Sequence, residues 1–173
     1  RGAARIICET LHGETATGAT TLFLEEKVDT GEWLLQQRIS IGAEETAGEL
    51  HDRLSQLGAE VLLETVNLIE QGTAPRIKQV GEVTRAPKIT KEICHIDWRK
   101  DTVSIFNLIR GLSPFPRAFS YFKGQEFKIC RASIAPIAPL QNGTPGEIVA
   151  VDRERIVVAD GSGCLAITEV QPE

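Results

Sequence analysis

Asp29, Thr30 and Gly31 form a short run whose residue types and spacing suggest catalysis. A carboxylate on a glycine turn at the end of a strand can face a cleft and act as a general base or orient a histidine. The alternative is an aspartate that only caps a hairpin turn. Aspartic proteases share the Asp-Thr-Gly run but need a second aspartate in a matching loop. This chain has a single copy, followed by Glu32, so the protease interpretation fails.

Other catalytic patterns do not occur in the sequence. Neither of the glycine-rich runs that cradle phosphates is found, and the Gly-Ser-Gly run at 161–163 is better interpreted as a hairpin turn. The four cysteines and three histidines are scattered, with no paired spacing typical of a metal site. We therefore expect reduced, buried thiols and no metal. No apolar run approaches the roughly 18 residues of a membrane span.

Charge divides the chain into two halves. Residues 1–73 carry 5 Lys and Arg against 13 Asp and Glu, whereas residues 74–173 carry 14 against 11. Basic and aromatic residues are interleaved between Arg117 and Lys128, an arrangement that suits RNA backbone contact with base stacking. The alternatives are an ordinary solvated surface for the charges and a packed core for about half of the aromatic rings.

The segments around the Asp-Thr-Gly turn indicate how it is positioned. Two strand-like segments, 19–29 and 33–41, flank the turn, and the second alternates between apolar and polar residues. A short helix is expected over 4–13. A capping-box spacing and a leucine period predict a longer helix over 46–72. Together these elements predict an α/β unit in residues 1–73.

The second half of the chain has a different pattern. Residues 74–92 contain prolines, a glycine and basic residues without periodicity, so we interpret them as an exposed linker. A short helix follows over 101–111, with Asp101 or Thr102 as its N-cap. Several short strand-like runs separated by glycine turns then follow, and they predict a small closed or half-closed barrel within 93–173.

Several sequence runs occur in the same order in one known family. The run GETATGATTLFLEEKVDTGEWLL at 13–35 is similar to a GETETGVT…DTGDML segment, and NLIRGLSPFPRAFSY at 107–121 is similar to an NxIRGxxPxPGA(Y/F) run. With ETAGELHDRLSQLGAEVLLET, RAPKITKEICHIDW and ADGSGCLAITEVQPE, the chain resembles the methionyl-tRNA formyltransferases. The resemblance implies the remainder of a Rossmann-like formyltransferase domain over 1–73, a linker over 74–92 and an OB-like tRNA-binding domain over 93–173.

The resemblance also implies a reaction. Asp29 matches the family's catalytic aspartate, which acts beside an Asn and a His of an Asn-x-His motif. The family transfers a formyl group from 10-formyltetrahydrofolate to the amino group of methionyl initiator tRNA. That Asn and His have no counterpart here, and the chain opens on Arg1 and contains no Met, so we expect a fragment without its N-terminal part. The turn that remains to contact the folate contains Glu25, Glu26, Val28 and Asp29.

The basic second half is where we expect contact with the tRNA backbone. Arg117 stands where the family usually has a small residue, which adds a charge to the side that the resemblance assigns to tRNA. Arg5 stands where the family usually has proline. We expect a cytoplasmic monomer that serves translation initiation without membrane contact. The candidate tRNA-binding residues are Arg85, Lys88, Lys91, Arg110, Arg117, Lys123 and Lys128.

Related families remain as alternatives at this point. Sugar-nucleotide formyltransferases, the hydrolase part of formyltetrahydrofolate dehydrogenase and glycinamide ribonucleotide transformylase would all keep an Asp-x-Gly turn. The runs HIDW and RGLSPFPRAFSY favour the tRNA enzyme over these. A different class of alternative is an RNA-binding module that is inactive by itself, because most of the active site has no counterpart in this chain.

Overall fold

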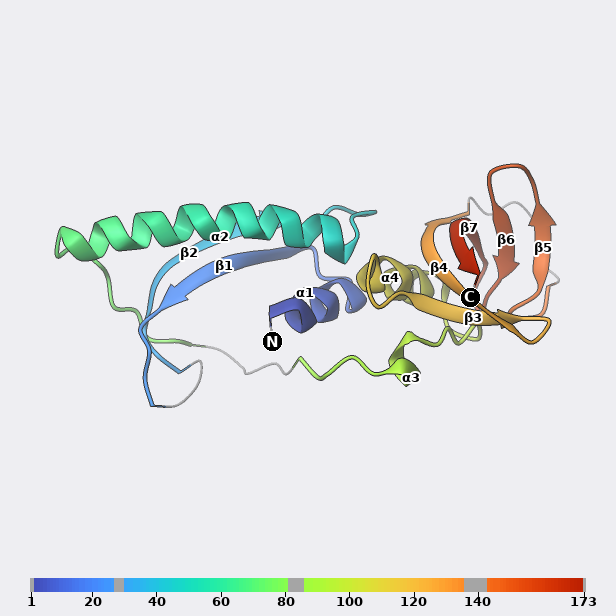
Figure 1. Ribbon diagram of the computed structural model, residues 1–173, viewed down its shortest axis with the longest axis horizontal. Coiled ribbons are helices and arrows are strands. Elements are labelled where there is room, and N and C mark those ends of the chain that lie inside the picture. The colour runs from blue at the N-terminus through green and yellow to red at the C-terminus, as the bar shows by residue number, and fades with distance from the viewer. Residues whose placement is uncertain (1, 27–29, 81–85, 136–142, 173) are drawn as a thin grey trace. The chain divides into compact units, whose positions relative to one another are not determined.

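The computed structural model describes residues 2–26, 30–80, 86–135 and 143–172 (Figure 1). These residues fall into two compact units, one of residues 15–42 and 49–85 and the other of residues 1–14, 43–48 and 86–173. Within the described residues, helices and strands follow in the order α1 (Gly2–Leu11), β1 (Ala16–Leu22), β2 (Trp33–Ser40), α2 (Ala47–Glu70), α3 (Lys91–Cys94), α4 (Thr102–Leu112), β3 (Ala118–Phe122), β4 (Gln125–Ile134), β5 (Ile148–Val151), β6 (Ile156–Ala159) and β7 (Cys164–Pro172).

The smaller unit is a β-hairpin with a helix along it. β1 and β2 pair antiparallel, and α2 runs along the two strands in Figure 1. The Thr21 and Thr65 hydroxyl oxygens lie 2.7 Å apart and join the sheet to the helix by a hydrogen bond. Glycine is needed at position 18, because a Cβ there would lie 2.2 Å from the carbonyl oxygen of Gln37.

α2 confirms the helix predicted over 46–72. Leu50 and Val61 are fully buried, and the buried Thr65 continues the same stripe at helical spacing. Leu62, another residue of the leucine period, is 56% exposed. It follows Val61 directly, so its side chain points about 100° away around the helix axis.

The larger unit packs α4 on a five-stranded antiparallel sheet with the strand order β3-β4-β7-β6-β5. The Asp101 carboxylate caps α4 by accepting a hydrogen bond from the backbone N–H of Ser104 at 3.0 Å. From the helix, Ile105 and Leu112 enter the core, where they join fully buried Leu165 of β7. Burial of these large side chains is the main stabilising term for the unit.

α1 completes this unit by packing against α4 (Figure 1). Ile7 of α1 is buried in the same core, and Leu11 lies at its edge. The two helices approach closely at Gly111, where an added Cβ would lie 3.3 Å from Leu11. α1 therefore belongs to the same compact unit as residues 86–173.

The predicted barrel is not confirmed, because the sheet is open in the part of the chain that the structure describes. The edge strands are β3 and β5, and no hydrogen-bonded pair joins them. Residues 95–96 occupy the outer edge of β3 instead, with the Ile96 N–H donating to the Phe119 carbonyl at 2.9 Å. Trp98 fills the space beyond, since its indole N–H donates to Ser120 and its ring lies against Gly146.

The predicted linker is partly structured. Trp33 of β2 and Ile77 exchange two backbone hydrogen bonds of 2.9 and 3.0 Å, so this part of 74–92 pairs with the hairpin. α3 lies at the other end of the same range. The compact units also differ from the predicted ranges 1–73 and 93–173, because α1 packs with the C-terminal residues.

The pairing at Ile77 changes where a protease should cut. Arg76 and Lys78 flank the paired residue, whereas Lys88 is exposed and lies outside any helix or strand. We expect limited trypsin to cut first within 85–91 and to spare Arg76 and Lys78, because cleavage requires the backbone to leave regular pairing. Mass spectrometry of the earliest fragments checks this. First cleavage at Arg76 or Lys78 would contradict the observed pairing.

Candidate functional site

The Asp-Thr-Gly turn lies in the loop between β1 and β2. Val28 and Asp29 lie outside the described residues, and Glu25 and Glu26 are exposed. The loop is closed at its base, where the Phe23 N–H donates to the Glu32 carbonyl at 2.9 Å. The structure therefore joins the described residues on the two sides of the loop, at Phe23 and Glu32.

Gly31 has a steric role in this loop. A Cβ at position 31 would lie 1.7 Å from the carbonyl oxygen of Phe23, a distance that no side chain can occupy. Gly31 is buried, so the backbone on the β2 side of the loop passes directly against the β1 side. The Asp-Thr-Gly run thus needs a glycine at position 31, because the backbone of Phe23 lies too close for any side chain.

Residues 76–79 hold the loop from outside. The Gln79 side-chain amide donates to the Gly31 carbonyl at 2.8 Å in a half-buried position. The Arg76 guanidinium contacts Glu32 at 3.3 Å and lies 4.1 Å from the ring centre of Phe23. The sequence patterns did not identify this clamp, because its residues lie 44 and 48 positions from their partners and form no motif.

The structure brings three of the predicted tRNA-binding residues together. Lys91, Arg117 and Lys128 line a cavity of about 320 Å³ beside α3, which we call the basic cavity. Its wall also contains Glu126, whose carboxylate lies 3.1 Å from the Lys91 ammonium. Lys91 also lies over the Phe119 ring, 5.1 Å from its centre. The Lys91 side chain is 68% exposed, so this ion pair contributes little stability and the ammonium stays accessible to a ligand.

Arg117 enters the basic cavity from a strained backbone position. Its φ of 78° lies in the left-handed region that few side chains adopt. One guanidinium nitrogen donates to the Gln171 side chain, while the buried Nε has no partner within the described residues. A buried donor without an acceptor is costly, so this position adds an unfavourable contribution to the fold.

The other predicted basic residues are separate from this cavity. Lys88 is exposed and lies outside any element, and Lys123 is exposed at the β3–β4 turn with a φ of 50°. Arg85 lies outside the described residues. Both described lysines point to solvent, where a polyanion can reach them.

Arg110 is a correction to the predicted set. Its side chain is only 7% exposed, and its guanidinium donates to the Asn107 side chain at 2.8 Å and to the Glu45 carbonyl at 3.2 Å. Burial lowers the pKa of the guanidinium below its usual value, and the charge also lies 5.7 Å from the Phe106 ring centre. Arg110 therefore joins parts of the fold and is not an exposed phosphate contact.

The aromatic residues divide between core and surface. Phe119 is 6% exposed and belongs to the hydrophobic core, and Phe127 is half-buried. Tyr121 and Phe122 are 55% and 48% exposed and remain accessible to a ligand. Both alternatives considered for these rings therefore apply, each to different residues.

The described residues do not favour metal or thiol chemistry. They contain no group of three His, Cys, Asp or Glu side chains placed to hold a metal ion. The cysteines are free thiols: Cys8, Cys94, Cys130 and Cys164. Burial raises the pKa of each thiol, which disfavours the reactive thiolate. None of the helices in the described ranges has the length and apolar character to cross a bilayer.

Comparison with known proteins matches both parts of the chain to one family. The family model "Formyl transferase" matches residues 1–66, and "Formyl transferase, C-terminal domain" matches residues 88–173. The methionyl-tRNA formyltransferase of Alkaliphilus oremlandii is 44% identical over 172 residues, and that of Acetivibrio thermocellus is 45% identical over 172 residues. Each match covers 99% of this chain and 55% of the relative, so the chain spans about half the length of the curated relatives it matches.

Solved structures share the fold. HypX from Aquifex aeolicus in complex with tetrahydrofolic acid aligns with a TM-score of 0.74 and 22% identity, over 97% of this chain and 29% of HypX. WlaRD, a sugar 3N-formyl transferase, aligns with a TM-score of 0.69 and 19% identity, over 98% of this chain and 59% of WlaRD. At these identities the likeness concerns the fold alone. The two family models together match residues 1–66 and 88–173, so the chain belongs to the formyl transferase family that they describe.

Proposed function

We propose that the complete protein transfers a formyl group from 10-formyltetrahydrofolate to the amino group of methionyl initiator tRNA, and so serves translation initiation in the cytoplasm. The observation that carries this proposal is the pair of hydrogen bonds that hold the two ends of the β1–β2 loop, at Phe23 and Gly31, because position 29 lies between them in the sequence. Curated relatives that are methionyl-tRNA formyltransferases support the choice of substrate.

Asp29 is the proposed catalytic residue of this chain. The amine of the methionyl group attacks the formyl carbon and loses a proton. The bond from that carbon to N10 of the folate then breaks, and N10 takes up a proton. Asp29 assists removal of the amine proton, directly or through a histidine. The negative charge on the formyl oxygen needs a donor such as an amide, which we assign to an Asn outside residues 1–173.

The folate is proposed to lie against the same loop. Glu25, Glu26, Val28 and Asp29 are the assigned contacts with the pterin, and the exposure of the two glutamates is compatible with that role. HypX, which shares this fold, has been solved with tetrahydrofolic acid. The proposed reaction transfers no electrons, and a carboxylate and an amide donor supply its acid–base chemistry without a metal.

We assign tRNA binding to the basic cavity and to the exposed lysines near it. Lys91, Arg117 and Lys128 line that cavity, and Lys88 precedes α3. Together with Arg85 and Lys123 they make up the proposed contact set after removal of Arg110. We propose the domain division 1–73, 74–92 and 93–173 for these roles, supported by family matches at 1–66 and 88–173. The protein is proposed to act as a monomer.

Two other functions are testable beside this one. WlaRD shares the fold at 19% identity, which favours a sugar formyltransferase only weakly against relatives 44% identical. A chain that binds RNA without catalysis is the second alternative. Formylation assays with charged tRNA and with an amino sugar nucleotide, run beside a tRNA-binding titration, separate the three.

For catalysis we expect Asp29→Asn in the complete enzyme to lower the formyl-transfer rate about 100-fold or more, because an acid–base partner is lost. Folate and tRNA affinities should change little. Single-turnover kinetics measures the rate, and Glu44→Gln, at an exposed position outside the loop, serves as the control. A variant that keeps more than about a tenth of the wild-type rate would falsify the assignment.

The clamp makes a separate prediction. Gln79→Leu removes the hydrogen bond to Gly31, so we expect kcat to fall about tenfold through misplacement of the loop. KM for folate and the melting temperature should stay close to wild type, because the lost interaction lies outside the core. Gln71→Leu is a matched control at an exposed position directly after α2. Equal kcat in both variants would show that the clamp does not position the loop.

For tRNA we expect Lys88→Ala/Lys91→Ala to weaken binding of any tRNA about equally and to flatten the log–log salt slope by about one to two, since each neutralised phosphate contributes about 0.7 to 0.9. Discrimination of the initiator should survive. Arg38→Ala/Arg153→Ala removes the same charge from exposed positions elsewhere and should leave the slope unchanged. An unaltered slope in the lysine variant would contradict the assignment.

A further inference from the structure

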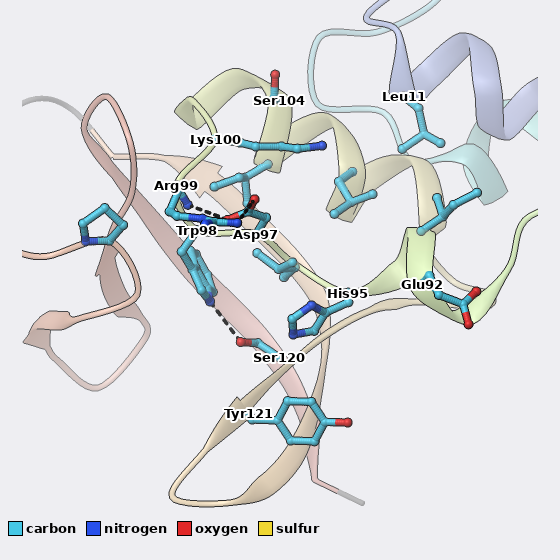
Figure 2. A pocket seen from close by; sticks show the side chains of 15 residues that line it. Leu11, Glu92, His95, Asp97, Trp98, Arg99, Lys100, Ser104, Ser120 and Tyr121 are labelled. Atoms are coloured by element: carbon cyan, nitrogen blue, oxygen red, sulfur yellow. Dashed lines mark hydrogen bonds and ion pairs between the residues drawn. The ribbon is translucent and has the colours of Figure 1, made fainter.

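A second cavity lies beside the basic cavity and uses different residues. Its volume is about 860 Å³, within the range of roughly 300–1,000 Å³ typical of small-molecule sites. Figure 2 shows His95, Trp98 and Tyr121 around Ser120 at its mouth. We call it the ring pocket.

The rings are held in fixed positions. The Trp98 indole N–H donates to the Ser120 hydroxyl at 2.9 Å (Figure 2). The ring centre of His95 lies 5.2 Å from that of Phe119 and 5.9 Å from that of Tyr121, and both contacts are tilted. His95 and Tyr121 are exposed although both belong to this aromatic cluster, so faces of their rings are open to a ligand.

The backbone on the pocket's polar side is equally constrained. The Lys100 carbonyl accepts a hydrogen bond from the Gly161 N–H at 2.9 Å, and a Cβ at Gly161 would lie 2.1 Å from the Arg99 carbonyl oxygen. On the other side the pocket reaches the apolar core, where Ile96 and Ile105 are each 1% exposed. The pocket is therefore preformed, which reduces the entropy lost when a ligand binds.

The charges that line the ring pocket cancel. Asp97 accepts two hydrogen bonds from the Arg99 guanidinium, at 2.8 and 2.9 Å, and these lower the Asp97 pKa to about 2. Glu92 and Lys100 add one further charge of each sign. A bare phosphate gains little in such surroundings, whereas a flat uncharged heterocycle can stack on the rings and use both donors and acceptors.

We propose that the ring pocket holds an unpaired nucleobase of bound RNA, packed against the His95 and Tyr121 rings. The inference rests on the proposed function only for the source of the RNA. The two sites then bind different parts of the RNA. Phosphates bind in the basic cavity, where cations gather, and a base binds in the ring pocket, where the charges cancel. A base in a duplex cannot enter the pocket, since its faces are already covered by neighbouring base pairs.

The test compares affinity with its salt dependence in the full protein. We expect His95→Ala and Tyr121→Leu each to weaken tRNA binding about five- to tenfold, a typical effect of losing one stacking ring, with no change in salt slope. Tyr121→Phe keeps the ring and should retain the wild-type affinity. His51→Ala, on the exposed surface of α2, is the control for removal of an imidazole.

Trp98 supplies a direct readout. In a Trp33→Phe background it is the remaining tryptophan of residues 1–173, and a short single-stranded RNA should quench its fluorescence while a duplex of the same sequence should not. Quenching that survives both His95→Ala and Tyr121→Leu, or no quenching, would overturn the ring pocket as a base site. Unchanged tRNA affinity in both variants would do the same. Failure of the wild-type protein to bind tRNA at all would instead count against the proposed function, and the single-stranded RNA would still report on the pocket.

Discussion

The pairing of residues 95–96 with the outer edge of β3 is the constraint on which both cavities depend. The Ile96 N–H is bound to the Phe119 carbonyl at 2.9 Å, and Ile96 itself is 1% exposed, so this segment is fixed from its backbone and from its side chain. Side chains before and after it then face different surroundings. Lys91, before it, reaches the basic cavity, and Trp98, after it, lines the ring pocket. The same pairing occupies the edge that a closed barrel would have needed for β5.

The ends of the β1–β2 loop are also held by backbone groups, through close contact between two backbone segments and not through side-chain packing. Gly31 lies so close to the Phe23 carbonyl that no larger residue fits, and Gln79 binds the carbonyl of the same glycine. Loop ends held in this way lose little further entropy when a substrate binds. This suits a proposed catalytic carboxylate, whose effect depends on placement more than on its intrinsic basicity.

Local signals predicted local structure well and long-range structure poorly. The capping box and leucine period gave α2, because both act within a few residues along one helix. The period alone did not separate buried Val61 from exposed Leu62, since a run of adjacent apolar residues does not show which one points inward. The order of the five strands was not predictable, because it depends on pairing between residues far apart in the sequence, such as Ile134 of β4 with Leu165 of β7. The clamp at Gln79 was missed for the same reason.

Arg110 shows why charge alone does not identify a binding surface. Its guanidinium was grouped with the tRNA candidates by sequence, yet it donates to Asn107 and to the Glu45 carbonyl while 7% exposed. Burying a cation costs free energy that only such hydrogen bonds offset, so a residue of this kind is committed to the fold. Lys91 also has a partner, Glu126, but its side chain is 68% exposed, so a phosphate can compete with the carboxylate at little desolvation cost. Two properties therefore decide which cations are available to a polyanion: the exposure of the side chain, and the cost of exchanging its protein partner for a phosphate. The number of basic residues does not decide it.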